Sequence, residues 1–179
     1  MNKLTNYLQR IYRLSVSFKK HEDIVWNDLK SLIQKANWRA GVFEKEKYIE
    51  LAFEIGENTG GHYFYCVGDN QFSCRVKVAT DYPSEQAEAI FILASHFNNL
   101  LNHGMVYVNP DGRYISYVLE CNLLIPLLYP GELHTYLLLH YNTSKNVYWA
   151  FQRLLNEDEA PAIIIADLLK KNEEEKKEE

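Results

Sequence analysis

Three β-rich runs follow one another between residues 48 and 80, and short turn sequences join them. In YIELAFEI, residues 48–55, the odd positions are apolar and the even positions mostly polar, which predicts a strand with one face on a core. The runs HYFYCV and FSCRVKVAT follow, with ENTGG and Gly-Asp-Asn between the runs. Because strands joined by tight turns run antiparallel, this region predicts an antiparallel sheet, which restricts the fold more than any other feature.

Helical periodicity flanks this region. Apolar residues recur every three or four positions in residues 3–19 and again in residues 23–37, where Asp23 or Asn27 could cap the helix. Residues 81–104 predict the clearest helix of the chain. Its expected buried stripe is Ile90, Phe91, Ala94, Phe97 and Leu101.

A second hairpin follows, because Asn-Pro-Asp-Gly at 109–112 stands between the β-rich runs MVYV and RYISYVLECNLLI. A long helix is expected over 131–155, with an interruption near 142–144 where helix propensity is weak. Pro161 opens a short last helix. The expected fold class is α+β: an antiparallel sheet of about five strands, in the order helix, three strands, helix, two strands, helix, with helices packed on one face.

The chain divides into four expected segments. Residues 1–21 form an N-terminal amphipathic helix, and residues 22–156 form the main α+β domain. Residues 157–170 form the short C-terminal helix, and residues 171–179 a charged tail.

The net charge of −5 is unevenly distributed. Residues 1–40 carry eight basic and three acidic side chains, whereas residues 41–170 carry eight and sixteen. The basic segment could dock on the acidic part, meet an acidic partner, or simply provide solvated helix faces. The acidic body argues against nucleic-acid binding, which needs a clustered basic surface.

Three cysteines are no disulfide framework, and the odd count fits a reducing cytosol. No apolar run approaches the roughly 18–20 residues of a membrane span. The N-terminal sequence lacks the continuous apolar stretch of a secretory signal. A cytoplasmic location with no integral membrane segment is expected.

Cys66 and Cys74 stand eight residues apart around a turn. With a two-residue loop at Asp69-Asn70 the two thiols point to opposite faces of the sheet. A three-residue loop would set them directly opposite each other, but it would require Gln71 in the left-handed conformation, where Gly or Asn is usual. Turn chemistry therefore favours the first register, and a structural hairpin rather than a metal or redox site.

No pattern in the remaining chain indicates catalysis. The histidine pairs 96/103 and 134/140 lack metal-ligand spacing. Neither a nucleophile elbow nor a glycine-rich phosphate loop appears. We expect no catalytic residue, no metal site and no cofactor.

The element order and three local patterns resemble a known family. The patterns are the helix start after Asp81-Tyr82-Pro83, the hairpin NPDGRYISYVLECNLL and the aromatic closing helix VYWAFQRLL. Residues 22–155 with these features resemble the bacterial YbjN-like family, which shares its fold with type III secretion chaperones. The resemblance implies a chaperone-like α+β domain that binds protein segments or regulates, with no catalytic residues. Residues 1–20 and 157–179 lie outside it, and the additional N-terminal helix departs from the family pattern.

An aromatic surplus on the sheet suggests where a partner binds. In the favoured register His62 and Phe64 point away from the core, whereas in the other register the two tyrosines of the same run do. Exposed tyrosines recur at interfaces because they offer much contact area with few rotatable bonds. The N-terminal helix or a second subunit could also cover this face. The candidate protein-binding surface is Tyr48, His62, Phe64, Tyr114 and Val118.

The sequence thus predicts a non-catalytic protein-binding domain, adaptor- or chaperone-like, that captures an amphipathic or extended segment of another protein. A homodimer is compatible with the same surface. The alternative is a small-ligand sensor or enzyme with a pocket between the sheet and the helices.

Overall fold

The computed structural model describes residues 3–178, with the side chains of residues 4–171. The strands are β1 (Ala40–Phe43), β2 (Tyr48–Gly56), β3 (Thr59–Gly68), β4 (Gln71–Thr80), β5 (Met105–Asn109) and β6 (Tyr114–Asn122). The helices are α1 (Lys3–Ser15), α2 (Phe18–Lys35), the 3-10 turn η1 (Ser84–Gln86), α3 (Ala87–Leu100), α4 (Leu124–Leu128), α5 (Glu132–Glu157) and α6 (Pro161–Glu178).

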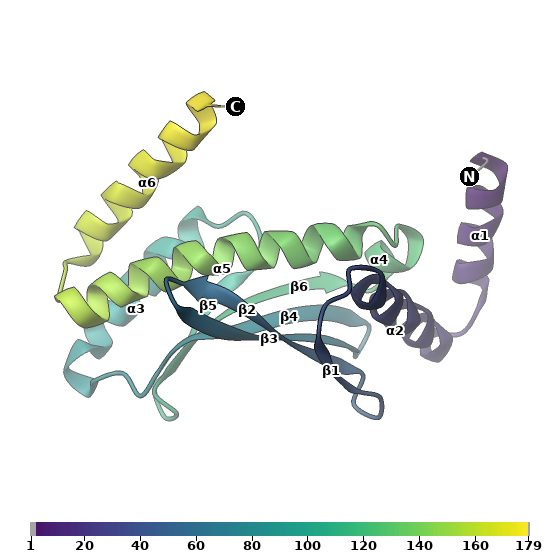
Figure 1. Cartoon of the computed structure of the whole chain (residues 1–179), viewed down its shortest axis with the longest axis horizontal. Helices are drawn as coiled ribbons and strands as arrows, with labels where there is room; N and C mark the ends of the chain where they lie inside the picture. The colour runs from purple at the N-terminus through teal and green to yellow at the C-terminus, as the bar shows by residue number, and fades with distance from the viewer. Residues whose placement is uncertain (1–2, 179) are drawn as a thin grey trace. The chain divides into compact units, whose positions relative to one another are not determined.

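Within the described residues the strands form one antiparallel sheet in the order β1-β2-β3-β4-β6-β5, with helices packed on it (Figure 1). The predicted α+β fold class is confirmed, although the sheet has six strands rather than about five. The additional strand is β1, whose four residues are too few to show an alternating pattern and include Gly41. It pairs antiparallel with β2, with Val42 opposite Ile49 and Phe43 opposite Tyr48.

Contacts within the chain divide it into two compact units. The first comprises residues 1–52, 62–74 and 120–139 and includes α1, α2, β1 and α4. Its buried side chains come from one face of α2 and from alternate positions of the strands, as a sheet with one face on a core requires. They include Val25, Leu29 and Ile33 of α2, Ile49 and Leu51 of β2, Tyr63, Tyr65 and Val67 of β3, and Phe72 and Cys74 of β4.

The second unit comprises residues 53–61, 75–119 and 140–179 and includes α3, β5 and α6. The ring of Phe97 in α3 stacks on that of Phe151 in α5, with 6.1 Å between the centroids. The buried stripe of α3 is Ile90, Leu93, Ala94 and Phe97. The predicted burial of Phe91 is wrong, because this side chain is 46% exposed, one helical step away from the stripe.

The turn between β3 and β4 has two residues, Asp69 and Asn70, and both have a positive φ, 51° and 59°. Two left-handed residues in succession are the signature of a type I′ hairpin turn. Cys74 is buried, whereas Cys66 is half-buried among the outward-facing residues of β3. The favoured register is therefore confirmed, and the two thiols lie on opposite faces.

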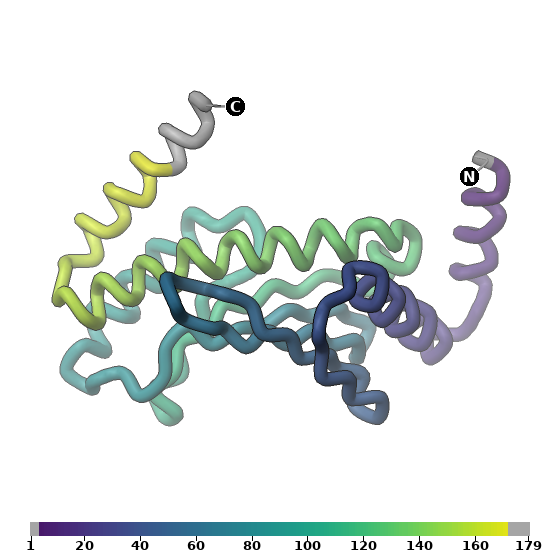
Figure 2. The backbone as a smooth tube through the Cα atoms, viewed as in Figure 1, coloured from purple at the N-terminus to yellow at the C-terminus, as the bar shows by residue number. Residues whose placement is uncertain are grey.

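Helix α2 begins earlier than predicted, and the cap at Asp23 or Asn27 is wrong. The chain leaves α1 at Ser15 and turns into α2 at Phe18, as Figure 2 shows. Ser17 occupies the N-cap position in an extended conformation, and its carbonyl oxygen accepts hydrogen bonds from the N–H groups of Lys20 and His21, at 2.8 and 3.1 Å. The residues between Ser17 and Asp23 include lysine and glutamate, which favour helix.

The two C-terminal helices also differ from expectation. The interruption predicted near 142–144 is absent, since α5 runs unbroken through these residues. The hydroxyl of Ser144 donates to the carbonyl oxygen of Tyr141 at 2.7 Å within the helix. Helix α6 begins at Pro161, as predicted, but it runs on to Glu178 through most of the expected tail 171–179. Glutamate and lysine are good helix formers, so the charged sequence extends the helix. Met1, Asn2 and Glu179 lie outside the described residues.

Candidate protein-binding surfaces

The structure places the five predicted surface residues in different surroundings. Tyr48, His62 and Phe64 belong to the first unit, whereas Tyr114 and Val118 belong to the second. Tyr48 and Phe64 are half-buried and His62 is exposed. Val118 is only 7% exposed, so its predicted place on an open surface is wrong. It lies on β6, which is flanked by a strand on each side.

The half-buried rings of the first unit form an aromatic row across three strands. Phe43 of β1 stacks on Tyr48 of β2, with 4.2 Å between centroids and an interplanar angle of 12°. Tyr48 in turn lies 6.4 Å from Phe64 of β3. Phe43 is 38% exposed and stands at the end of the row nearest the sheet edge. The row confirms that Tyr48 and Phe64 share a face, but their rings cover one another in part.

In the second unit Tyr114 takes part in a smaller cluster. The ammonium group of Lys77 lies 4.8 Å from the centroid of its ring, and the ring of Tyr107 lies 6.3 Å away. Tyr107 is 46% exposed. This cluster is held together by a cation–π contact and an aromatic pair, and Tyr114 is half-buried within it.

Strand β1 is an edge of the sheet, since the described residues place a strand on only one side of it. Residues of an antiparallel strand direct their backbone N–H and C=O groups alternately toward and away from the paired strand. About half of the β1 groups therefore face away from β2. An open edge of this kind is a template for another extended chain.

A cavity of about 390 Å³ lies on one face of β1, between this strand and α2. Its apolar wall includes Ile33 of α2, Trp38, and Val42 of β1. The Lys30 ammonium and the Trp26 indole N–H both donate to the Glu44 carboxylate, at 2.8–3.0 Å, and hold the pKa of Glu44 below its usual range. The cavity is thus apolar inside, with a charged pair at its boundary.

A second cavity, of about 310 Å³, lies on the opposite face of the same strand. Gly41 offers no side chain there, and the cavity is bordered by Arg39, Glu50 and His62. The imidazole Nδ1 of His62 lies 2.7 Å from the Glu50 carboxylate. The two faces of β1 therefore carry cavities of different chemistry, one apolar and one polar.

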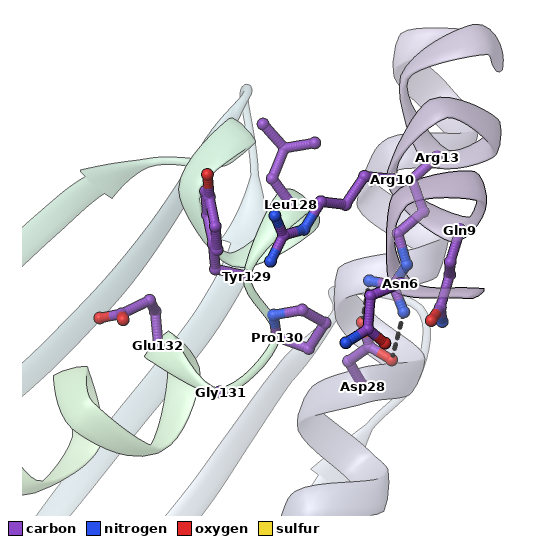
Figure 3. Close-up of a pocket in the computed structure, with 10 residues that line it drawn as sticks. All are labelled: Asn6, Gln9, Arg10, Arg13, Asp28, Leu128, Tyr129, Pro130, Gly131 and Glu132. Carbon is purple, nitrogen blue, oxygen red and sulfur yellow. Dashed lines mark hydrogen bonds and ion pairs between the residues drawn. The ribbon is translucent and has the colours of Figure 1, made fainter. Parts of the chain in front are cut away.

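Helix α1 is attached to the first unit through its polar side. The Arg13 guanidinium donates to both carboxylate oxygens of Asp28 in α2, at 2.5 and 3.2 Å (Figure 3). It also donates to the carbonyl oxygen of Leu127 in α4 at 3.0 Å. The Arg10 guanidinium carbon lies 4.4 Å from the centroid of the Tyr129 ring. Arg13 is buried, whereas the large apolar side chains of α1 are exposed.

A cavity of about 550 Å³ separates the polar face of α1 from the corner between α4 and α5. Asn6, Arg10 and Arg13 line it from α1, and Tyr129 and Glu132 line it from the corner (Figure 3). The side-chain oxygen of Asn6 is buried there and accepts no hydrogen bond within the described part of the chain. Helix α1 is thus held by a few polar contacts across an open space, not by close packing.

Burial favours the neutral forms of two cysteines and one histidine. Burial raises the pKa of the Cys121 thiol to about 11 and that of Cys74 well above its usual value. Burial lowers the pKa of His140 to about 4, partly offset by its contact with the carbonyl oxygen of Tyr117. Protonated thiols are poor nucleophiles and poor metal ligands, so this environment supports a structural role for these cysteines.

In residues 3–178, no cluster of three or more His, Cys, Asp or Glu side chains could hold a metal ion. None of the described helices combines the length and apolar character that a membrane-spanning helix needs. Comparison of the chain with protein-family models, with curated proteins and with solved structures finds no match. The resemblance to the YbjN-like family therefore stays a prediction.

Neither β1 nor the attachment of α1 was predicted from the sequence. Residues 38–43, WRAGVF, hold three large apolar side chains in a short run, and this was the available signal for β1. No sequence pattern pointed to the ion pair between Arg13 and Asp28, because its partners lie fifteen residues apart on different helices.

Proposed function

We propose that this protein is a non-catalytic, adaptor- or chaperone-like binding domain that captures an extended segment of another protein by adding it to the sheet beside β1. The observation that carries the proposal is the open edge of β1 with a cavity on each face. Main-chain hydrogen bonds to an exposed strand provide affinity in this mode of recognition, and pockets for alternate side chains provide specificity.

The chemistry of the two cavities suggests a pattern for the captured segment. Successive side chains of an extended chain point to opposite faces. One set would enter the apolar cavity beside Val42 and Ile33, and the other would lie on the opposite face, next to Arg39 and Gly41. The expected segment therefore alternates apolar residues with polar residues, among which a carboxylate suits Arg39.

The test is selection of peptides from a displayed library of random decamers, followed by measurement of their affinity for the full chain. We expect enriched peptides with alternating apolar and polar positions. Val42→Lys should weaken their binding about tenfold or more, because it puts a charge where an apolar side chain is buried. Because Val42 is 44% exposed, the melting temperature of the Val42→Lys variant should differ from that of the unmodified chain by no more than about 3 °C.

Ile92→Lys is the matched control, since Ile92 is 45% exposed on α3 and belongs to the other unit. The control variant should bind the enriched peptides as the unmodified chain does. Strand addition would be refuted if no peptide were enriched, or if Val42→Lys and Ile92→Lys bound the peptides equally well. Slower amide hydrogen exchange in the complex, at those β1 amides that face away from β2, would locate the bound strand directly.

A second candidate function is a small-ligand sensor, favoured by the apolar cavity of about 390 Å³ because it lies between the sheet and α2. A thermal-shift screen of metabolites distinguishes the two functions, since a ligand that binds the folded state raises its melting temperature. A ligand whose effect disappears in Val42→Lys would favour the sensor, and the absence of any shift would count against it.

A further inference from the structure

Helix α1 is oriented opposite to most amphipathic helices, because its polar side, and not its apolar side, faces the rest of the first unit. Its polar side faces the first unit through Arg13, which is 8% exposed. Its apolar side chains are 47–65% exposed, and Phe18 at the start of α2 is 69% exposed. The exposed apolar side chains of α1 are Leu4, Tyr7, Leu8, Ile11, Tyr12 and Leu14. A helix normally buries its apolar stripe against its own core, so this stripe is available to another molecule.

The exposed area of the apolar stripe is comparable with the area that one partner contributes to a protein–protein interface. Large side chains of this type offer on the order of 200 Å² each, and about half of this area is exposed here. The whole stripe then exposes roughly 700 Å², close to the roughly 800 Å² that one partner contributes to a stable protein interface. It also exceeds the roughly 300–600 Å² of the largest apolar patch on a typical monomer.

The spacing of the stripe is that of a helix that packs along another helix. Leu4 and Ile11 are seven residues apart, as are Tyr7 and Leu14, and the two pairs are offset by three residues. These are the a and d positions of two heptads, whose side chains insert between those of a facing helix. Arg10 occupies the g position, immediately before the a position of Ile11. Side chains at g positions select the partner helix by charge.

The positive charge of this segment indicates which kind of partner helix binds α1. Residues 3–21 carry five Lys and Arg side chains and no Asp or Glu. An antiparallel pair of two α1 helices would bring Arg10 and its equivalent to the same side, so like charges oppose self-association. An anionic membrane is also less suited, because Arg13 is buried against Asp28, so this charge on the polar face of α1 is not free to meet lipid headgroups.

We infer that α1 is a docking helix for an amphipathic helix of another protein, whose apolar stripe is bordered by carboxylates. The apolar stripe of the partner covers Ile11 and its neighbours. A partner carboxylate pairs with the Arg10 guanidinium, which lies over Tyr129 at the mouth of the 550 Å³ cavity. This surface is separate from the edge of β1, and the inference does not rest on strand capture there.

The test uses the full chain and two synthetic helical peptides of fourteen residues. Both carry Leu and Ile at the a and d positions; one has Glu and the other Lys at the flanking e and g positions. We expect the Glu peptide to bind about tenfold or more tightly than the Lys peptide at low salt, with a difference that shrinks as salt is added. Affinity is measured by fluorescence anisotropy of the labelled peptides.

Two variants assign the binding to α1. Ile11→Ser should weaken Glu-peptide binding about tenfold, whereas Ile92→Ser, equally exposed on α3, should leave it unchanged. Arg10→Glu should reduce binding of the Glu peptide and increase binding of the Lys peptide. Val42→Lys, which tests strand capture, should leave Glu-peptide binding unchanged, so failure at one site is distinguishable from failure at the other.

Three results would overturn the inference. Equal affinities of the Glu and Lys peptides would show that α1 does not select its partner by charge. Equal losses in Ile11→Ser and Ile92→Ser would place the binding elsewhere. Self-association of the full chain through Ile11, or sedimentation with vesicles of 30% phosphatidylserine in the absence of Glu-peptide binding, would assign the stripe to a second copy or to a membrane.

Discussion

Arg13 shows how one side chain can decide the orientation of an element. Of the described side chains of α1 it is the buried one, and its guanidinium joins Asp28 of α2 and the backbone of α4. A charge is costly to bury unless it is paired and hydrogen-bonded, and the two carboxylate oxygens of Asp28 satisfy this requirement. The contact turns the apolar side chains of the helix outward.

Substitution of Arg13 by Met is expected to release α1 without unfolding the rest of the first unit. Hydrogen bonds to charged groups contribute about 1–3 kcal/mol, and few other contacts hold the helix. Amide hydrogen exchange over residues 3–15 should accelerate about tenfold or more, while exchange over residues 18–35 stays the same. Exchange measured by mass spectrometry checks this, with Arg39→Met, an exposed arginine, as the control. Unchanged protection of α1 would show that other contacts hold it.

At the scale of elements, connections were harder to predict than the helices and strands themselves. The link from α3 to β5 is an example from the second unit. The Asn98 side chain of α3 exchanges two hydrogen bonds with the backbone of Val106 in β5, at 2.7 and 3.1 Å. Gly104 in the link has φ +74°, and a Cβ there would lie 2.6 Å from the Tyr117 hydroxyl oxygen. The sequence indicates a turn at Gly104, but it does not reveal how closely the Tyr117 hydroxyl approaches this glycine.

Gly104→Ala is therefore expected to destabilise the chain by about 2–4 kcal/mol, from the left-handed conformation and the steric overlap together. The Tyr117 hydroxyl would be displaced from the carbonyl oxygen of His103, to which it donates at 2.9 Å. Urea unfolding checks the prediction. Gly68→Ala is the control, because no heavy atom lies within 4 Å of a Cβ at that position. Equal midpoints for the two variants would mean that the link adjusts without strain.

At the scale of the whole molecule, the stability of the fold depends on keeping His140 neutral. This histidine is fully buried, and its ring stacks on that of Tyr117 with 5.1 Å between centroids. Its pKa is about 4 in the folded chain and about 6.5 when unfolded. Between these values the unfolded chain binds a proton that the folded chain does not, so stability falls as the pH falls.

The free energy of unfolding should accordingly decrease between pH 6.5 and 4, by on the order of 3 kcal/mol, and be insensitive to this group above pH 7. Chemical denaturation at a series of pH values measures it. His140→Asn should flatten the slope in this window even if it lowers stability at pH 7. His96→Asn, at an exposed histidine, should retain the slope. A slope that persists in His140→Asn would assign it to other groups.

The α+β class, the predicted hairpins and the β3–β4 register could be derived from the amino-acid sequence, because alternation and turn chemistry are local properties. Asp69 and Asn70 are residues that accept left-handed conformations, so the turn could be recognised from the chain alone. The favoured register also placed Tyr48 and Phe64 on one face of the sheet, and their rings lie 6.4 Å apart.

The edge strand, the burial of Val118 and the orientation of α1 depend on contacts that form only when the chain folds. Four residues are too few to show a period, so β1 is recognisable only from its pairing with β2. The sequence pattern of an amphipathic helix is the same whether its apolar stripe faces inward or outward. The pattern shows which residues form the stripe, but it does not show what packs against them. For α1 that choice rests on a contact between residues distant in sequence, Arg13 and Asp28, and such contacts exist only once the chain has folded.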